Sequence, residues 1–101
     1  VIGLTKSLAI ELGPYNVRCN AICPGSVRGG RINRVIEGEA KVRGVPFDVV
    51  AAEIVNNQSI ARFTEAEEVA DLCLYLASPR AAMITGQDIA IDGHVEVFHI
   101  K

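Results

Sequence analysis

The stretch Asn20–Val27, with the sequence NAICPGSV, decides the fold because an apolar run ends there at a Pro-Gly pair. Residues 17–23 are mostly apolar on both alternating faces, which is typical of a parallel strand that is covered on both sides. The strand should end at Pro24, which cannot donate a ladder hydrogen bond, and Gly25 lets the backbone turn. Ligands of open α/β sheets bind just beyond the carboxyl ends of strands. We therefore expect a binding site at this strand end.

A helix is predicted on the N-terminal side of the strand, over residues 1–12. It has few polar positions, so it should be buried on more than one side, against a sheet and against a partner subunit. Gly13 is expected to end it in the left-handed conformation, and Pro14 prevents its continuation. The helical pattern already runs at Val1 without a capping residue, and we therefore expect the chain to be a piece of something longer.

Residues 28–62 predict two short amphipathic helices separated by glycines. Apolar residues recur at helical spacing between Ile32 and Ala40 and again between Phe47 and Ile54. Such a segment after a strand end is typical of a substrate lid over a pocket, although an ordinary helical connection explains it equally well. Four arginines of this segment could meet a phosphate or an acidic substrate, or could simply be solvated. They are Arg28, Arg31, Arg34 and Arg43.

Residues 64–77 predict the clearest helix. Thr64 should cap it, with Glu67 completing a capping box. Its buried stripe is expected to comprise Val69, Leu72, Cys73 and Leu76. Residues 87–91 predict a second strand, and Asp92–Gly93 predict a turn. The apolar tail is expected to pack against something, such as another subunit. That tail comprises Val95, Val97, Phe98 and Ile100.

The composition fits one small α/β domain of 101 residues, because half of the residues are hydrophobic and 22% are charged. The net charge of −2 and the scattered basic residues argue against a nucleic-acid partner. No apolar run approaches the length of a membrane span, and no signal peptide is visible. The three cysteines have no metal-ligand spacing, and we expect them to be buried free thiols in a reducing cytoplasm. They are Cys19, Cys23 and Cys73.

The residues alone give no complete catalytic set. A Gly-rich dinucleotide loop, a Walker loop and a hydrolase elbow are all absent from the sequence. His94 and His99 have no metal-ligand pattern around them, so no metal site is expected. Asn20 is expected to tie loops together by hydrogen bonds rather than to act in catalysis.

Several segments nevertheless resemble, in order and spacing, the C-terminal half of the short-chain dehydrogenase/reductase family. They are GLTKSLAIEL (3–12), VRCNAICPG (17–25), EEVA (67–70), LAS (76–78), ITGQ (84–87) and IDG (91–93). The resemblance implies the C-terminal portion of a doubly wound Rossmann fold, with two parallel strands, flanking helices and a helical lid. It also implies NAD or NADP as cofactor, and hydride transfer between nicotinamide and a small carbonyl or alcohol substrate.

By the same resemblance, the cofactor-binding residues are those at the strand end. They are Pro24, Gly25, Ser26 and Val27. The backbone of Val27 is the candidate to hold the nicotinamide carboxamide, since backbone groups are fixed before a ligand arrives. The family often has a Thr where this chain has Gly29, so a hydroxyl contact to the cofactor phosphates is lost there or supplied elsewhere.

The family's catalytic Tyr-x-x-x-Lys pair and its Ser do not match this chain. Tyr15 and Tyr75 are followed four residues later by Cys19 and Pro79, so the chain holds no catalytic residue by this resemblance. The resemblance implies that the chain begins just after the catalytic Lys. We therefore expect residues 1–101 alone to be inactive, and the complete enzyme to be a homo-oligomer, commonly a tetramer in this family.

Two other interpretations stay open from the sequence. The chain could be a truncated, non-catalytic interaction or oligomerisation module, which its apolar first helix and tail would suit. It could also be a different nucleotide-binding α/β domain, in which Val27 would lie far from the carboxyl end of the strand.

Overall fold

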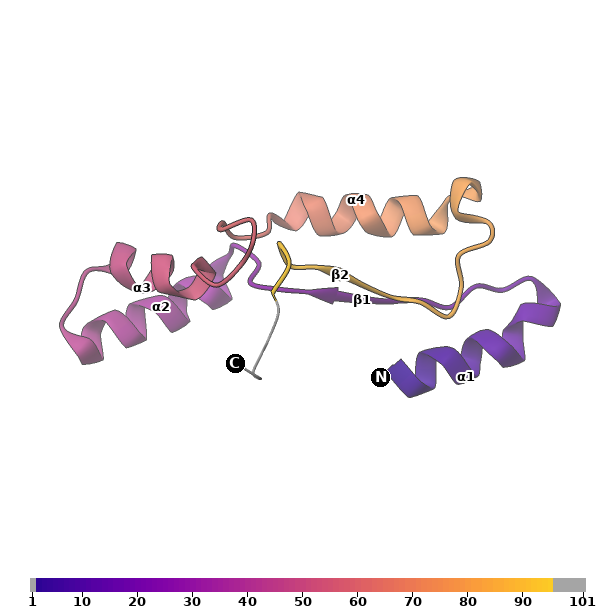
Figure 1. Ribbon diagram of the computed structural model, residues 1–101, viewed down its shortest axis with the longest axis horizontal. Coiled ribbons are helices and arrows are strands. Elements are labelled where there is room, and N and C mark those ends of the chain that lie inside the picture. Colours follow the sequence, from indigo (N-terminus) through magenta and orange to yellow (C-terminus); the bar gives the residue numbers. More distant parts are fainter. Residues whose placement is uncertain (1, 96–101) are drawn as a thin grey trace. The chain divides into compact units, whose positions relative to one another are not determined.

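The computed structural model describes residues 2–95, which form four α-helices and two parallel β-strands (Figure 1). In chain order they are α1 Ile2–Leu12, β1 Ala21–Pro24, α2 Gly30–Arg43, α3 Phe47–Val55, α4 Ala66–Ala77 and β2 Asp88–Ile91. The strands β1 and β2 are hydrogen-bonded neighbours. Ala21 N–H donates to Gln87 O (2.8 Å), and four residues later Gly25 N–H donates to Ile91 O (3.2 Å), so the two strands run in the same direction.

The chain divides into two compact units. The first comprises the residues up to Cys23 together with Glu67–Ala90. The second comprises Pro24–Ala66 together with the segment from Ile91 onward. The predicted fold class, a C-terminal portion of a doubly wound α/β fold, is confirmed, and the predicted elements are present with shifted ends.

In the first unit the predicted strand over residues 17–23 is wrong at its start, because β1 begins at Ala21. The preceding backbone is bonded to other groups: Cys19 N–H donates to the Thr85 hydroxyl (3.0 Å), and Cys19 O accepts from Gly86 N–H (2.8 Å). Asn20 fills the role predicted for it. Its side chain donates to Ile84 O (2.9 Å) and accepts from Gln87 N–H (3.1 Å), tying the loop before β2 to the start of β1.

The predicted left-handed stop at Gly13 is also wrong. Residues Gly13–Tyr15 continue from α1 as a 3-10 turn, in which Pro14 supplies its fixed φ. The left-handed residue is Asn16 (φ 61°), whose N–H donates to Gly13 O at 2.8 Å. Asparagine tolerates this conformation better than most residues because its short polar side chain bonds locally.

Apolar burial in this unit is weaker than the sequence predicts. The helix α1 buries only Thr5 and Ala9, while the exposed fractions of Leu4 and Ile10 are 64% and 77%. The predicted buried thiols are a further correction, because Cys23 and Cys73 are exposed and Cys19 is half-buried. The physical reason is the width of the sheet: two strands cover little of the apolar surface that flanking helices present.

Arg18 ties the C-terminal end of α4 to the loop that follows it. Its guanidinium donates to the carbonyl oxygens of Leu76, Ala81 (2.9 Å) and Ser78 (3.4 Å). The last carbonyls of a helix lack intrahelical partners, and a cation there also complements the helix dipole. One side chain therefore satisfies three acceptors on a segment about 60 residues away in the sequence.

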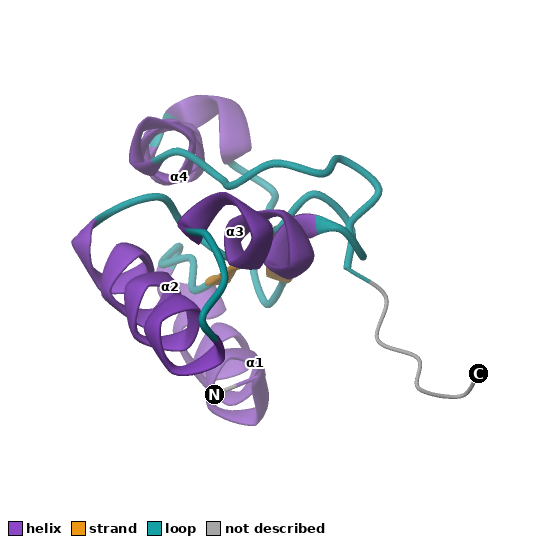
Figure 2. Cartoon of the chain, turned by 90° about the vertical axis from the view of Figure 1, so that its left-hand side faces the viewer, coloured by secondary structure: helices purple, strands orange, loops and turns teal. Residues whose placement is uncertain are grey.

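In the second unit α2 and α3 pack against each other, which confirms the two short amphipathic helices predicted for residues 28–62 (Figure 2). The core between them comprises Ile36, Ala40, Val50, Val55 and Phe63. Gly44 ends α2 in the left-handed conformation (φ 69°), and Pro46 directly precedes α3. Such a pair of caps produces a tight helical hairpin.

A bidentate ion pair joins the last residue of α2 to α3. The Arg43 guanidinium donates to both carboxylate oxygens of Glu53, at 2.6 and 3.1 Å. These hydrogen bonds hold the pKa of the Glu53 carboxyl below its usual value and raise the pKa of Arg43 above its own. The pair is exposed, so salt screens it.

The segment after β1 is held by a parallel bridge between Val27 and Thr64. Thr64 N–H donates to Ser26 O (2.9 Å), and Arg28 N–H donates to Thr64 O (2.8 Å). The Thr64 hydroxyl donates to Ile91 O (3.3 Å). The predicted cap at Thr64 is therefore wrong, because α4 begins at Ala66. Thr64 instead forms hydrogen bonds with the segment after β1.

Gly25 lies against the chain just beyond β2. A Cβ atom at this position would be 2.6 Å from the Cβ and 2.9 Å from the Cα of Asp92, distances that only a glycine avoids. The predicted turn at Asp92–Gly93 is present, with Gly93 in the left-handed conformation (φ 69°). Val95 pairs with Gln58 in an antiparallel bridge. The predictions for Val97, Phe98, His99 and Ile100 lie outside the described residues.

Replacing Arg18 by Ala should lower the free energy of unfolding by about 1–3 kcal/mol, because three carbonyl acceptors lose their donor. Urea denaturation of the protein measures this loss. Arg80→Ala is the matched control, since the exposed Arg80 side chain makes no hydrogen bond or ion pair within residues 2–95, and it should change the free energy by less than about 0.5 kcal/mol. Equal losses in the two variants would show that the bonds from Arg18 add nothing specific.

Replacing Gly25 by Ala should cost about 1–3 kcal/mol of stability, because the new methyl group overlaps Asp92 and the backbone must shift. Gly38→Ala is the control within α2: a Cβ there meets no atom within 4 Å, and alanine should stabilise the helix by about 0.5–1 kcal/mol. The measurement is again the urea midpoint. A Gly25→Ala protein as stable as its parent would contradict the close approach.

Candidate functional site

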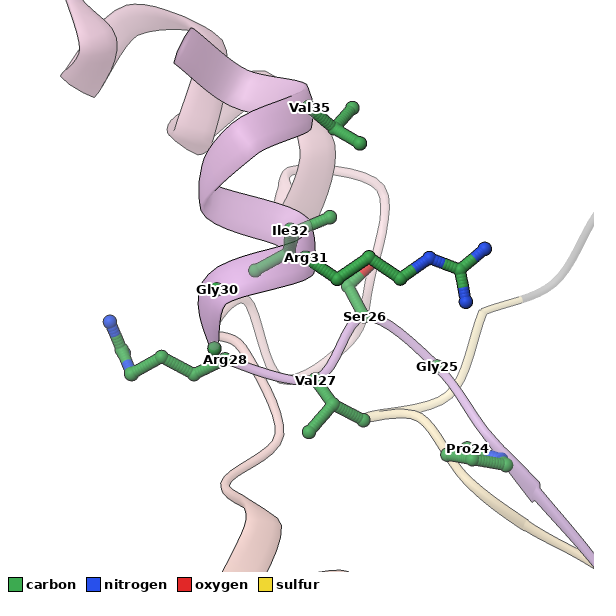
Figure 3. A pocket seen from close by; sticks show the side chains of 10 residues that line it. Pro24, Gly25, Ser26, Val27, Arg28, Gly30, Arg31, Ile32 and Val35 are labelled. Carbon is green, nitrogen blue, oxygen red and sulfur yellow. The ribbon is translucent and has the colours of Figure 1, made fainter.

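The predicted site residues lie together at the carboxyl end of β1, where they line a pocket of about 650 Å³ (Figure 3). The lining residues are Pro24, Gly25, Ser26, Val27, Arg28, Gly29, Gly30, Arg31, Ile32 and Val35. One wall is the segment that follows β1, and the other is the first turns of α2. The first part of the segment predicted as a lid therefore forms one wall of the pocket.

The backbone N–H and C=O of Val27 both point away from Thr64, its partner in the parallel bridge. In a parallel bridge the neighbours of one bridging residue bond the partner strand, and that residue's own N–H and C=O point away from it. Here Ser26 and Arg28 take the bonds to Thr64. Within residues 2–95 the N–H and C=O of Val27 make no hydrogen bond. One donor and one acceptor on a single fixed residue suit a primary carboxamide, which offers an acceptor oxygen and N–H donors.

The side chains that line the pocket are either apolar or basic. Ile32 and Val35 project from successive turns of α2 (Figure 3). Arg28 and Arg31 are the only charged residues of the lining. Arg34 and Arg43, which the sequence singled out with them, do not line this pocket, and Arg43 is engaged with Glu53.

Residues that position the site escaped the sequence analysis. Thr64 and Asp92 hold the segment after β1 from two sides, by hydrogen bonds and by close contact. Phe63 carries the guanidinium of Arg28 over its ring, 5.5 Å from the ring centre. The IDG stretch (91–93), which the sequence predicts as a turn, was the available signal for the contact between Asp92 and Gly25. Nothing local to the IARFT stretch (60–64) marks Thr64 as a partner of Val27.

Within residues 2–95 no group of three His, Cys, Asp or Glu residues could hold a metal ion. None of the helices in the described range is long and apolar enough to cross a membrane.

Comparison with known proteins gives the family. The profile of a family described as "Enoyl-(Acyl carrier protein) reductase" matches residues 1–95, almost the whole chain. The rat protein "Dehydrogenase/reductase SDR family member 6" is 43% identical over 93 residues, which cover 92% of this chain and 36% of the rat protein. The chain thus spans about a third of the length of such relatives.

Solved structures agree with the sequence matches. A short-chain dehydrogenase family protein from Francisella tularensis superposes with a TM-score of 0.86 at 33% identity, covering 91% of this chain and 38% of that one. L-sorbose reductase from Gluconobacter frateurii, solved with NADPH and L-sorbose, also gives a TM-score of 0.86, at 26% identity, covering 93% and 36%. The order of elements, the pocket at the strand end and these matches agree: the chain belongs to the short-chain dehydrogenase/reductase family.

Proposed function

We propose that this chain forms the nicotinamide side of the cofactor site in an oxidoreductase that uses NAD or NADP. The observation that carries the proposal is the free N–H and C=O of Val27 at the edge of the pocket. When bound, the dinucleotide supplies or accepts a hydride. Val27 would hold its carboxamide by two hydrogen bonds, and Pro24, Gly25 and Ser26 would line the same end of the site.

The family membership and a solved relative support this assignment. L-sorbose reductase, which matches 93% of this chain, was solved with NADPH. The two bonds to the carboxamide would fix which face of the ring meets the substrate, because the donor and the acceptor cannot be exchanged. The backbone is already held by Thr64, so little ordering is needed when the cofactor binds.

We propose that the substrate is a small molecule with a carbonyl or alcohol group and that α2 and α3 act as its lid. The pocket wall formed by Ile32 and Val35 supports this role, since it supplies an apolar surface across from the segment after β1. The proton-transfer residues of the family, a Tyr-x-x-x-Lys pair and a Ser, are not among residues 1–101. This chain would therefore bind and orient the cofactor and the substrate and exclude water from the pocket. Residues elsewhere in the protein would transfer the proton.

We also propose that α1 packs against a second copy of the chain in a homo-oligomer. The proposed oligomer is a tetramer, the state that is common in the family. The exposed apolar side chains of α1 favour this contact, with Leu4 at 64% and Ile10 at 77% exposure. The same surface favours the second candidate function, a non-catalytic oligomerisation module. A reducing cytoplasm is the proposed compartment, supported by three free thiols.

The proposal predicts a change in amide exchange at one residue. Without nucleotide, the Val27 amide should exchange rapidly, because nothing within the described residues accepts its hydrogen. Saturating NADH or NADPH should slow it at least about tenfold, as one hydrogen bond is gained. NMR-detected hydrogen exchange of the full-length protein measures this effect. The Arg28 amide is the control, since it already donates to Thr64 O (2.8 Å) and should be protected in both states. An unchanged rate at Val27 with nucleotide bound would refute the role.

A second prediction separates the enzyme from the module. Purified residues 1–101 should show no NAD(P)H-dependent turnover of carbonyl substrates, because they lack the family's Tyr-x-x-x-Lys pair. The full-length protein, assayed by the absorbance of the reduced nicotinamide, should be active. Turnover by residues 1–101 alone would overturn this division of roles. An inactive full-length protein that still assembles would favour the module.

A further inference from the structure

The pocket at the end of β1 carries positive charge and no negative charge in its lining. Two of its ten lining residues are arginines, and none is an aspartate or a glutamate. The first turn of α2, which forms one wall, holds no acidic residue either. A ligand that fills this pocket therefore meets two guanidinium groups and no carboxylate among the lining residues.

The positive charge of Arg28 is paired with a carboxylate of the same chain. Its Nε donates to Glu65 Oε2 at 2.9 Å, and its guanidinium carbon lies 5.5 Å from the centre of the Phe63 ring. The ion pair and the ring contact both stabilise this orientation. In Figure 3 the Arg28 side chain runs away from Ser26 and Gly25. Arg28 is therefore not the group that a ligand would neutralise.

Arg31 is the charged residue that remains. Its guanidinium makes no hydrogen bond or ion pair with any group of residues 2–95. In Figure 3 its side chain leaves the first turn of α2 and extends past Ser26, on the opposite side from Arg28. Ile32 and Val35 line the pocket beside it. An unpaired planar guanidinium next to an apolar wall matches a small molecule with an apolar body and an oxyanion at one end.

We infer that Arg31 binds a carboxylate on the substrate, so that the enzyme acts on small carbonyl or hydroxy acids. The inference rests on the proposed function, because it places the substrate in the pocket beside the nicotinamide. A guanidinium binds a carboxylate through two parallel N–H···O bonds, and the same fork fits a phosphate. The cofactor diphosphate is thus the other source of an oxyanion. The position of Arg31 on the lid, beside Ile32, favours the substrate.

The test compares butyrate with its neutral methyl ester, methyl butyrate, as ligands of the full-length protein with and without saturating NADH or NADPH. The two share an acyl chain and differ in charge, and the ester lacks the carboxamide that Val27 is proposed to bind. Dissociation constants come from a ligand-observed NMR titration, so turnover is not needed. We expect the parent to bind butyrate at least about tenfold more tightly than methyl butyrate, as for a hydrogen-bonded charge. In Arg31→Gln that preference should disappear, and in Arg31→Lys it should be partly kept, because lysine has the charge without the planar fork.

Arg34→Gln is the matched control. Arg34 lies one turn further along α2, does not line the pocket and likewise has no ion pair within the described residues. It should keep the preference for butyrate. Loss of the preference in both variants would show that α2 attracts anions only through its general charge, and that result would overturn the inference.

The other possible results of these titrations distinguish a failure of the inference from a failure of the proposed function. If Arg31→Gln weakens the binding of NADH or NADPH at least about tenfold and keeps the preference for butyrate, Arg31 serves the cofactor diphosphate and the inference is wrong. Equal affinities of the parent for butyrate and methyl butyrate would also overturn it. If neither nucleotide binds the parent, the proposed function fails. The titration without nucleotide still decides whether Arg31 binds a carboxylate.

Discussion

The parallel bridge between Val27 and Thr64 is the interaction on which the site depends. It spans 37 positions in the sequence and joins the segment after β1 to the residues that lead into α4. The Ile91 carbonyl supports it from the other side, since it accepts from Gly25 N–H (3.2 Å) and from the Thr64 hydroxyl (3.3 Å). A carbonyl oxygen has two lone pairs, so one acceptor can serve both donors. The three segments thereby fix one another.

This arrangement explains why backbone groups, rather than side chains, are offered at the pocket. The bridge satisfies Ser26 and Arg28 and leaves only the polar groups of the residue between them. Those groups cannot rotate away, so binding a carboxamide there costs little conformational entropy. Gly25 makes the geometry possible, because any larger residue would push the segment away from Asp92. The first turns of α2, in contrast, contribute side chains to the pocket, and side chains differ more readily in length and charge.

Local patterns predicted some of these features and could not predict others. The apolar spacing around Ile36 and Val50 predicted the helices α2 and α3, and the Pro-Gly pair predicted the end of β1. The start of β1 and the role of Thr64 depend on partners far away in the sequence, such as Thr85 and Val27, which no local pattern reveals. The burial of the cysteines was mispredicted for a related reason. An apolar face of a strand or a helix marks a surface that can be covered, and the covering element must be present for burial to follow.

The arginines of this chain show that residue type alone does not assign a role. Arg18 satisfies carbonyl oxygens at the end of α4, whereas Arg43 joins α2 to α3 through Glu53. Arg28 is paired with Glu65 and stacked on Phe63. The sequence predicts Arg28 and Arg43 to be solvated or to meet an anion and assigns no role to Arg18, yet each of the three donates to groups of the protein. A guanidinium can bind a ligand only with donors that the fold leaves unpaired. Of the two arginines that line the pocket, Arg31 is the one whose guanidinium has no hydrogen-bond or ion-pair partner within residues 2–95.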